Sequence, residues 1–312
     1  MPTQRVVFTE GEDQRILHAA SILSQDQGLD ISIVGDETSI SDCAQRHQIG
    51  IDGCRLIDPA TDHRKPHYAA QLQSIRRLNK LSIAERFVTK PLFFAAMMVA
   101  EHDADLVVAG ATCATKKVIE AAALCIGYDN DQDFASSFFI LEIPNRTEPI
   151  IVADCAVNIE PTAQQLALIA CDTARSASAF VAEPRVAMLS FSTQGSATHP
   201  AVSKVQEATA LAKQLNPALR IDGEMQVDTA LSERVAAQKW VGESAVAGRA
   251  NVLIFPDLNS GNIGYKLIQQ MTQARAIGPI LQGFRRPVAD LSRGASIEEI
   301  IEVTQVALRL QR

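Results

Sequence analysis

Short apolar runs alternate along the chain with longer segments in which apolar residues recur with the period of a helix. A short apolar run bounded by turn residues is typical of a buried strand, whereas the longer period is typical of an amphipathic helix. The runs predict strands at Val6–Phe8, Ile31–Val34, Asp105–Ala109, Ser137–Ile143, Ile150–Cys155, Val186–Phe191, Val252–Phe255 and Ile277–Leu281. The periodic segments predict helices near 13–25, 83–101, 115–126, 161–176, 200–215, 259–274 and 296–310.

This alternation of strands and helices predicts an α/β protein with mainly parallel sheets. Several predicted strands are apolar throughout, as expected when helices cover both faces of a sheet. The polar, turn-rich segment Pro144–Pro149 marks a candidate domain boundary. The irregular segment Gly278–Gly294 marks a second place where the chain could cross between domains.

Length and charge narrow the class of protein. The 312 residues, 47% of them hydrophobic, suffice for one large or two medium domains with a sizeable core. The net charge of −7 argues against extensive binding of nucleic acid or anionic membranes, but it permits a small basic pocket. The chain lacks an apolar run of the ~18 residues that a membrane span needs, and its first residues lack a signal-peptide core. A cytoplasmic protein is therefore expected.

The six cysteines form no CxxC pair and have no spacing to histidines that suits zinc. No metal site is predicted, and the thiols are expected to be reduced and mostly buried.

The segment LSRGASIEE (291–299) presents polar groups directly before an amphipathic helix. Ser292 offers a hydroxyl, Arg293 a guanidinium, and the helix start offers free backbone N–H groups, where an anion is favoured. Ser296 and Glu299 fit the S-x-x-E capping box. From these residues alone, an ordinary capped helix with a surface arginine is the favoured interpretation of the segment.

Three further polar, glycine-bearing loops follow predicted strands: GATCATKK (110–117), SFSTQGSATHP (190–200) and FPDLNSGNIGYK (255–266). Loops at the carboxyl ends of parallel strands are where α/β proteins bind ligands. Neither a GxGxxG nor a GxxxxGK[ST] motif is present, which disfavours a dinucleotide or P-loop site. The loops together favour an enzyme that handles a phosphorylated compound in a cleft.

Read together, these loops resemble the phosphate acetyltransferases and their phosphate butyryltransferase relatives. The resemblance extends in the family's order over nearly the whole chain, and diverges strongly only near 40–90. The matching stretches are VVFTEGEDQRIL (6–17), SSFFIL (136–141), ADCAVNIEPTAQQLA (153–167), EPRVAMLSFSTQGSATHPAVSKVQEA (183–208), DGEMQVDTAL (222–231), ANVLIFPDLNSGNIGYK (250–266) and AIGPILQGFRRPVADLSRGASIEEII (276–301).

The resemblance implies two α/β domains with an interdomain cleft, an architecture like that of isocitrate and isopropylmalate dehydrogenases. Residues 1–144 and 288–312 would form the first domain, and residues 145–287 would form an inserted second domain. It also implies a homodimer that converts acetyl-CoA and phosphate reversibly into acetyl phosphate and CoA. The partners would be these small molecules, with no tightly bound cofactor, metal, nucleic acid or membrane.

The resemblance also implies roles for individual residues. Glu299 would take the proton from the CoA thiol, Ser292 would hydrogen-bond the developing charge, and Arg293 would bind the anionic substrate. Glu299 replaces an aspartate found in many members. The substrate-binding positions implied are Ser190, Ser192, Gly195, Ser196, Asn262, Tyr265, Lys266, Arg76 and Thr115.

Two positions depart from the family pattern. Glu120 and Gln270 stand where family members usually carry arginine, and Lys116 lies one helical turn before Glu120. The leading hypothesis is an active acyltransferase for acetyl, or for propionyl or butyryl, groups. The alternative is an impaired member that binds acyl-CoA or regulates another protein. A metal-dependent decarboxylating dehydrogenase would need clustered aspartates and a nucleotide loop, which the sequence lacks.

Overall fold

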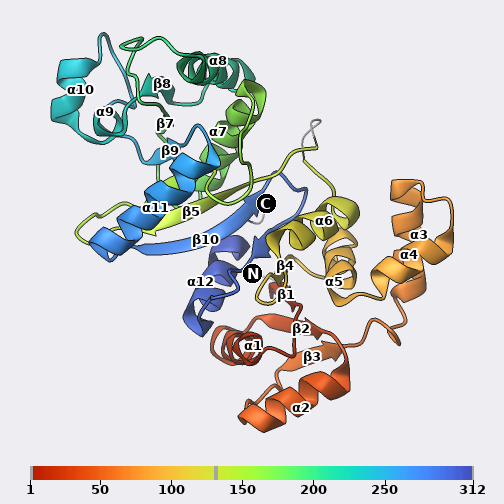
Figure 1. The fold of residues 1–312 in the computed structure, drawn as a ribbon. Helices are drawn as coiled ribbons and strands as arrows, with labels where there is room; N and C mark the ends of the chain where they lie inside the picture. Colours follow the sequence, from red (N-terminus) through yellow and green to blue (C-terminus); the bar gives the residue numbers. More distant parts are fainter. Residues whose placement is uncertain (1–2, 130–132, 311–312) are drawn as a thin grey trace. The chain divides into compact units, whose positions relative to one another are not determined.

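The computed structural model describes residues 3–129 and 133–310 (Figure 1). The chain divides into two compact units, Met1–Ala135 with Gly283–Arg312, and Ser136–Gln282. The second unit is therefore inserted in the first. Its two boundaries, at 135/136 and 282/283, come earlier in the sequence than the expected ones at 144/145 and 287/288. The turn at Pro144–Pro149 joins two paired strands inside the second unit, which is why the boundary falls before it.

The first unit contributes five neighbouring strands in the order β3-β2-β1-β4-β11, and each neighbouring pair among them is parallel. Its strands are β1 (Arg5–Phe8), β2 (Asp30–Val34), β3 (Cys54–Ile57), β4 (Leu106–Ala109) and β11 (Val288–Asp290). Its helices are α1 (Gln14–Gln27), α2 (Glu37–His47), α3 (Lys65–Arg76), α4 (Leu81–Val88), α5 (Pro91–Ala100), α6 (Thr115–Cys125) and α12 (Ile297–Leu308).

The second unit contains strands in the order β10-β5-β6-β9-β7-β8. The pairs β10–β5 and β5–β6 are antiparallel, and the remaining pairs are parallel. Its strands are β5 (Ser136–Glu142), β6 (Ile150–Ala153), β7 (Val186–Leu189), β8 (Ile221–Met225), β9 (Val252–Ile254) and β10 (Arg275–Gln282). Its helices are α7 (Ala163–Ala177), α8 (Pro200–Leu215), α9 (Val227–Leu231), α10 (Glu233–Lys239) and α11 (Leu258–Thr272).

The α/β class with mainly parallel sheets is confirmed. The single helix predicted at 83–101 is wrong in one respect, because it is two helices, α4 and α5. Pro91 is the first residue of α5, and proline has no N–H with which to continue a preceding helix. Helix α5 is buried along most of its length, with Phe94 and Met97 fully inaccessible to solvent.

Several strands and helices were not predicted from the sequence, because their composition is atypical of such elements. Strand β8 reads IDGEM, with glycine and acidic residues that are rare in strands. Strand β11 has only three residues, and helices α2 and α3 are more polar than the predicted ones.

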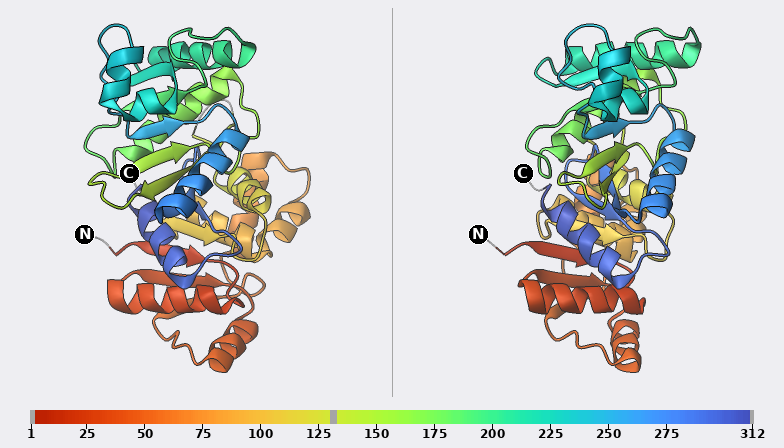
Figure 2. Two further views of the ribbon diagram at one scale, coloured as in Figure 1. Left: turned by 60° about the vertical axis from the view of Figure 1, so that its left-hand side comes forward. Right: turned by 90° about the vertical axis from the view of Figure 1, so that its left-hand side faces the viewer.

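The C-terminal helix α12 completes the first unit by packing against α1. In both views of Figure 2 this blue helix runs beside the red N-terminal part of the chain. The segment that leads into α12 is thereby fixed against residues from the start of the sequence.

Candidate active site

Three neighbouring strands of the first unit, β1, β4 and β11, end at the same edge of their sheet. The register pairs Phe8 with Val108 and Ala109 with Asp290, so the loops that follow these strands start side by side. This is the edge at which α/β proteins bind ligands. The three loops contribute Glu10, Gly110–Cys113 and Ser292–Ser296.

The carboxylate of Glu10 organises the loop after β4. Its Oε2 accepts the N–H groups of Gly110 and Ala111 at 3.0 and 2.8 Å, and its Oε1 accepts those of Thr112 and Cys113 at 2.9 and 2.8 Å. Successive N–H groups of this kind form an anion-binding nest. Here the protein's own carboxylate fills the nest, so these donors are engaged within the protein.

Arg15 fixes the turn that precedes α12. Its guanidinium pairs with Asp13 and donates to the carbonyl oxygens of Arg293 and Ala295, both at 2.9 Å, and of Ala111 at 3.2 Å. One side chain thus connects the loops after β1, β4 and β11. No sequence motif predicted this role for Arg15, although the residue lies in the family-like stretch 6–17.

The side chains of Ser292 and Arg293 are exposed at this turn. The Oγ of Ser292 accepts the N–H of Gly294 at 3.3 Å, which leaves its own proton available for donation. Within residues 3–129 and 133–310, the Arg293 guanidinium has no hydrogen-bond or ion-pair partner. The backbone of the turn is held, and the two polar groups on it are free to meet a ligand.

Ser296 and Glu299 form the expected capping box. Glu299 Oε2 accepts the Ser296 N–H at 2.9 Å, and Ser296 Oγ accepts the Glu299 N–H at 3.2 Å. Glu299 is exposed, and among the described residues its Oε1 has no partner. A carboxylate has two oxygens that can each accept hydrogen bonds. Glu299 can therefore cap the helix through Oε2 and still accept a proton on Oε1.

Asp290 lies buried beneath the turn and is 1% exposed. Its Oδ2 accepts the hydroxyl of Thr115 at 2.5 Å, whereas its buried Oδ1 has no partner among the described residues. Burial raises the pKa of Asp290 to about 7; the Thr115 bond opposes this rise and the charge of Glu10 adds to it. Thr115, an expected substrate ligand, therefore has its hydroxyl engaged with Asp290.

In the second unit, a buried carboxylate organises the loop after β7. Glu224 is 2% exposed, and its Oε1 accepts the Ser192 hydroxyl at 2.9 Å and the Gly195 N–H at 2.7 Å. Burial favours the neutral form, but bonds from Gly195, Gln206 and Ser192 outweigh it and lower the pKa of Glu224. The loop presents Ser196 as an exposed residue and Ser190 as a half-buried one.

The loop after β6 and the start of α11 form a second group of expected residues in this unit. Asn262 donates to the carbonyl oxygen of Cys155 at 3.0 Å. Tyr265 is 8% exposed and stacks on Phe139 in the core, with ring centroids 4.3 Å apart. Lys266 lies over the Tyr265 ring with an exposed side chain. Asn262 and Tyr265 thus have structural contacts, while Lys266 faces solvent.

The remaining expected cation, Arg76, is engaged at the end of α6. Its guanidinium donates to the carbonyl oxygens of Leu124, at 2.7 Å, and of Ala123. Such contacts satisfy carbonyl groups that a helix end leaves unpaired.

The two departures from the family pattern, Glu120 and Gln270, are both exposed. Lys116 is exposed as well, and among the described residues it forms no ion pair with Glu120. The lysine therefore does not neutralise Glu120 through a direct contact.

Within residues 3–129 and 133–310, histidine, cysteine, aspartate and glutamate form no group of three or more that could hold a metal ion.

The comparisons with known proteins agree over most of the chain. The family model for phosphate acetyl/butaryl transferase matches residues 2–308. A phosphate acetyltransferase of Thermoanaerobacterium thermosaccharolyticum is 43% identical, covering 96% of this chain and 93% of the relative. One of Clostridium acetobutylicum is 40% identical, with 98% and 93% covered. The crystal structure of a phosphotransacetylase from Streptococcus pyogenes superposes with a TM-score of 0.93 at 38% identity, covering 98% and 93%.

Replacement of Asp290 by Asn is expected to stabilise the protein relative to wild type, increasingly so as the pH rises. An unfolded chain releases the Asp290 proton near its ordinary pKa of 3.8, whereas the folded protein keeps it until about pH 7. Wild-type stability therefore falls across this window, and the loss is complete above it. Since one pKa unit is worth about 1.4 kcal/mol, the difference between variant and wild type should grow by up to about 4 kcal/mol.

Urea unfolding of both proteins at about pH 5 and about pH 8 measures the part of this difference that arises above pH 5, about 3 kcal/mol. Asp42→Asn, which removes an exposed carboxylate from α2, is the matched control. A difference for Asp290→Asn that does not change with pH would show that this carboxyl titrates normally.

Proposed function

Because the chain belongs to the phosphate acetyl/butaryl transferase family, we propose that it is a phosphate acetyltransferase. It would transfer an acetyl group reversibly between CoA and phosphate. The observation that carries the proposal is the turn Ser292–Ser296, where Arg15 fixes the backbone and leaves the Arg293 guanidinium without a protein partner.

In the proposed reaction, Glu299 accepts the proton of the CoA thiol and the thiolate attacks the carbonyl carbon of acetyl phosphate. A carbon–sulfur bond forms, the bond from that carbon to the bridging oxygen breaks, and phosphate leaves with the electron pair. Glu299 is suited to this role because Oε2 serves the helix cap and Oε1 remains open.

Arg293 and Ser292 would act on the charge that develops during the attack. A guanidinium can bind two oxygens of a phosphate at once, so Arg293 is proposed to hold the phosphoryl group. The Ser292 hydroxyl is proposed to donate to the oxygen of the carbonyl as it becomes negative. Neither side chain has to break a strong internal contact before it meets the substrate.

In the second unit, accessible side chains are proposed to bind substrate and the less accessible ones to hold the loops in place. Ser190, Ser196 and Lys266 have accessible side chains and are proposed to contact substrate directly. Ser192, Gly195, Asn262 and Tyr265 hold the loops that present them, through the contacts with Glu224, Cys155 and Phe139. In the first unit, Arg76 and Thr115 are proposed to support the site through α6 and Asp290.

The alternative of a non-catalytic family member is not favoured. The relatives that match nearly the whole chain are named phosphate acetyltransferases. The same names support acetyl over propionyl or butyryl as the transferred group. Glu120 and Gln270 are both exposed, so neither has to be accommodated in a packed core, which supports their tolerance in an active enzyme.

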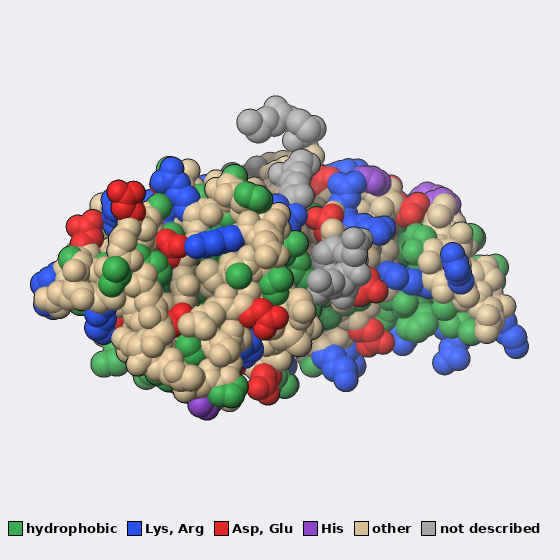
Figure 3. Space-filling model, turned by 90° about the horizontal axis from the view of Figure 1, so that it is seen from above, with side chains coloured by type: hydrophobic (Ala, Val, Ile, Leu, Met, Phe, Trp, Pro, Cys, Tyr) green, Lys and Arg blue, Asp and Glu red, His purple; other side chains and the backbone are tan. Residues whose placement is uncertain are grey.

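The proposed substrates, CoA, acetyl phosphate and phosphate, are all small anions, and no tightly bound cofactor is proposed. Acidic and basic side chains are interspersed on the face drawn in Figure 3, with no broad basic field for a nucleic acid. No helix in the described part of the chain is long and apolar enough to cross a membrane. The six free cysteines support a reducing, cytoplasmic location.

A homodimer is proposed on the basis of helix α11. Ile263, Leu267 and Met271 are 57%, 54% and 80% exposed and are spaced four residues apart. Residues with this spacing lie on one face of a helix. An apolar stripe of this kind is suited to pairing with the same stripe of a second copy.

Purified protein is expected to form acetyl-CoA from acetyl phosphate and CoA at ~1 s⁻¹ or faster, as measured by the absorbance of the new thioester. Arg293→Ala should lower kcat/KM about tenfold or more, because it removes a charge-assisted contact with substrate. Arg86→Ala, which removes an exposed arginine of α4, is the control and should retain wild-type kinetics. Absence of turnover with acetyl, propionyl and butyryl phosphate, from folded protein, would contradict the transferase assignment.

Glu299→Gln should distinguish the two functions of Glu299, as helix cap and as proposed base. Glutamine can still accept the Ser296 N–H, so the melting temperature should stay close to wild type. It cannot take a proton, so kcat should fall by about a hundredfold or more. Ser296→Ala is the reciprocal variant, expected to lower stability by about 1 kcal/mol while retaining most activity.

Glu298→Gln, at the neighbouring exposed position, should leave kcat unchanged. Equal loss of activity in both glutamine variants would remove Glu299 from the role of base.

Leu267→Glu should convert the proposed dimer to a monomer, because it places charge in the middle of the apolar stripe. Sedimentation equilibrium should give twice the chain mass of 33.7 kDa for wild type and the chain mass for the variant. Leu215→Glu, at a 60% exposed position at the end of α8, is the control and should stay dimeric. A wild-type protein of single chain mass would exclude the dimer.

A further inference from the structure

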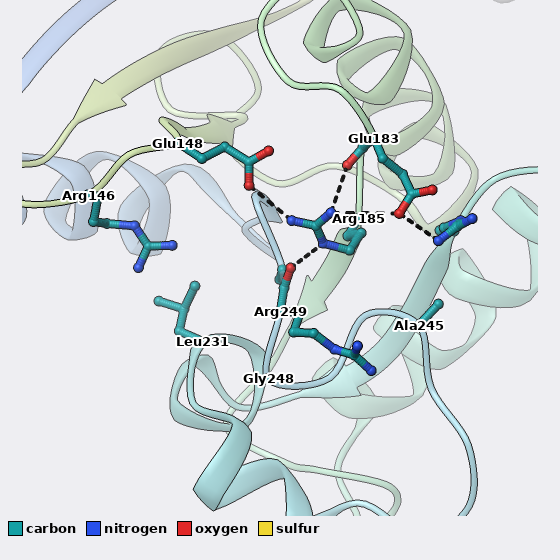
Figure 4. A pocket seen from close by; sticks show the side chains of 10 residues that line it. Arg146, Glu148, Glu183, Arg185, Leu231, Ala245, Gly248 and Arg249 are labelled. Carbon is teal, nitrogen blue, oxygen red and sulfur yellow. Dashed lines mark hydrogen bonds and ion pairs between the residues drawn. The ribbon is translucent and has the colours of Figure 1, made fainter.

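A pocket of about 500 Å³ opens in the second unit at the amino-terminal ends of its parallel strands (Figure 4). Each strand follows closely on a charged residue of the pocket: Glu148 for β6, Arg249 for β9, Arg185 for β7 and Arg220 for β8. Because the strands neighbour one another in this order, the charges form a row. The loops proposed to contact substrate follow the opposite ends of the strands, ~13 Å away for a four-residue strand.

Two glutamates neutralise two of the arginines in this row. Arg185 pairs with Glu148 at 3.0 Å and with Glu183 at 3.7 Å, and its Nε donates to the carbonyl oxygen of Arg249. Glu183 also pairs with Arg220 at 2.6 Å. Figure 4 shows the Arg185 guanidinium between the two carboxylates. These contacts form a fixed, internally neutral part of the pocket wall.

Two arginines of the pocket remain without an effective counter-charge. The side chain of Arg146 has no partner among the described residues. The Nε of Arg249 lies 3.9 Å from Glu233, but these side chains are 61% and 76% exposed, so solvent screens the pair. The pocket therefore carries an excess of positive charge on a chain whose net charge is −7. Arg146 and Arg249 lie on either side of Leu231 in Figure 4.

We propose that this pocket binds a small organic anion that carries two acidic groups. Its two carboxylate or phosphate groups would pair with Arg146 and Arg249, and its body would cover the apolar surface of Leu231 and Ala250. Guanidinium groups recognise both anion types through paired hydrogen bonds. The volume is within the range of small-molecule sites, and the acidic chain as a whole is unsuited to a nucleic acid. None of the residues that line this pocket is one of those proposed to act in the transferase reaction.

Isothermal titration of the full chain at fixed ionic strength tests the proposal, with succinate as the probe with two carboxylates and pyrophosphate as the probe with two phosphate groups. At least one probe should bind wild type. Arg146→Ala and Arg249→Ala should each weaken that binding about tenfold or more. Both arginines are exposed, so the folded structure should survive their removal.

Two control variants locate the binding. Arg234→Ala removes an exposed arginine of α10 outside the pocket and should not change the affinity. Arg293→Ala should also retain binding, because Arg293 does not line the pocket. Trp240, the single tryptophan, lines an adjoining hollow together with Arg249, so its fluorescence should change when the probe binds.

Because Arg293 is itself proposed to bind phosphate, the decisive comparison is made in an Arg293→Ala background. Binding there that survives the further changes Arg146→Ala and Arg249→Ala would overturn the proposal. So would the failure of both probes to bind wild type. Loss of binding in Arg293→Ala would assign the probe to the proposed catalytic turn instead.

Discussion

The candidate active site depends on the guanidinium of Arg15. This side chain joins Asp13, the carbonyl of Ala111 and two carbonyls of the turn before α12, and so connects three loops that are distant in sequence. A backbone held by hydrogen bonds can present side chains in a fixed geometry before substrate arrives, which is the requirement for electrostatic stabilisation of developing charge. Because Arg15 contacts only the backbone of this turn, Arg293 keeps its own charge for a ligand.

In each unit, a carboxylate accepts hydrogen bonds from the backbone N–H groups of a loop. Glu10 fills a nest of N–H groups in the first unit, and Glu224 holds the loop after β7 in the second. Each has a fixed position and supports a loop that also presents exposed residues, Thr112 in the first unit and Ser196 in the second. The backbone donors that these two carboxylates accept are engaged within the protein.

The parts of the fold that the sequence predicted are those in which a single local property decides the structure. Strands such as Val186–Leu189 are apolar throughout, and Ser296 with Glu299 is a local capping signal, so both could be predicted. Strand β8 could not, because Glu224 is buried in it by hydrogen bonds from a different loop. The family resemblance pointed to Ser292 and Arg293, but the role of Arg15 depends on contacts 278 and 280 residues away, which no local pattern contains.

The insertion of the second unit also has a consequence for the order of synthesis. Strand β11 pairs with β4, and α12 packs on α1, yet both final elements follow the entire Ser136–Gln282 segment in the chain. During translation, the first unit must wait without its last strand and last helix while the second unit emerges and can already fold. Ser292, Arg293 and Glu299 leave the ribosome only after that inserted segment has been made. The nascent protein is thus expected to acquire the candidate turn only after synthesis of the second unit.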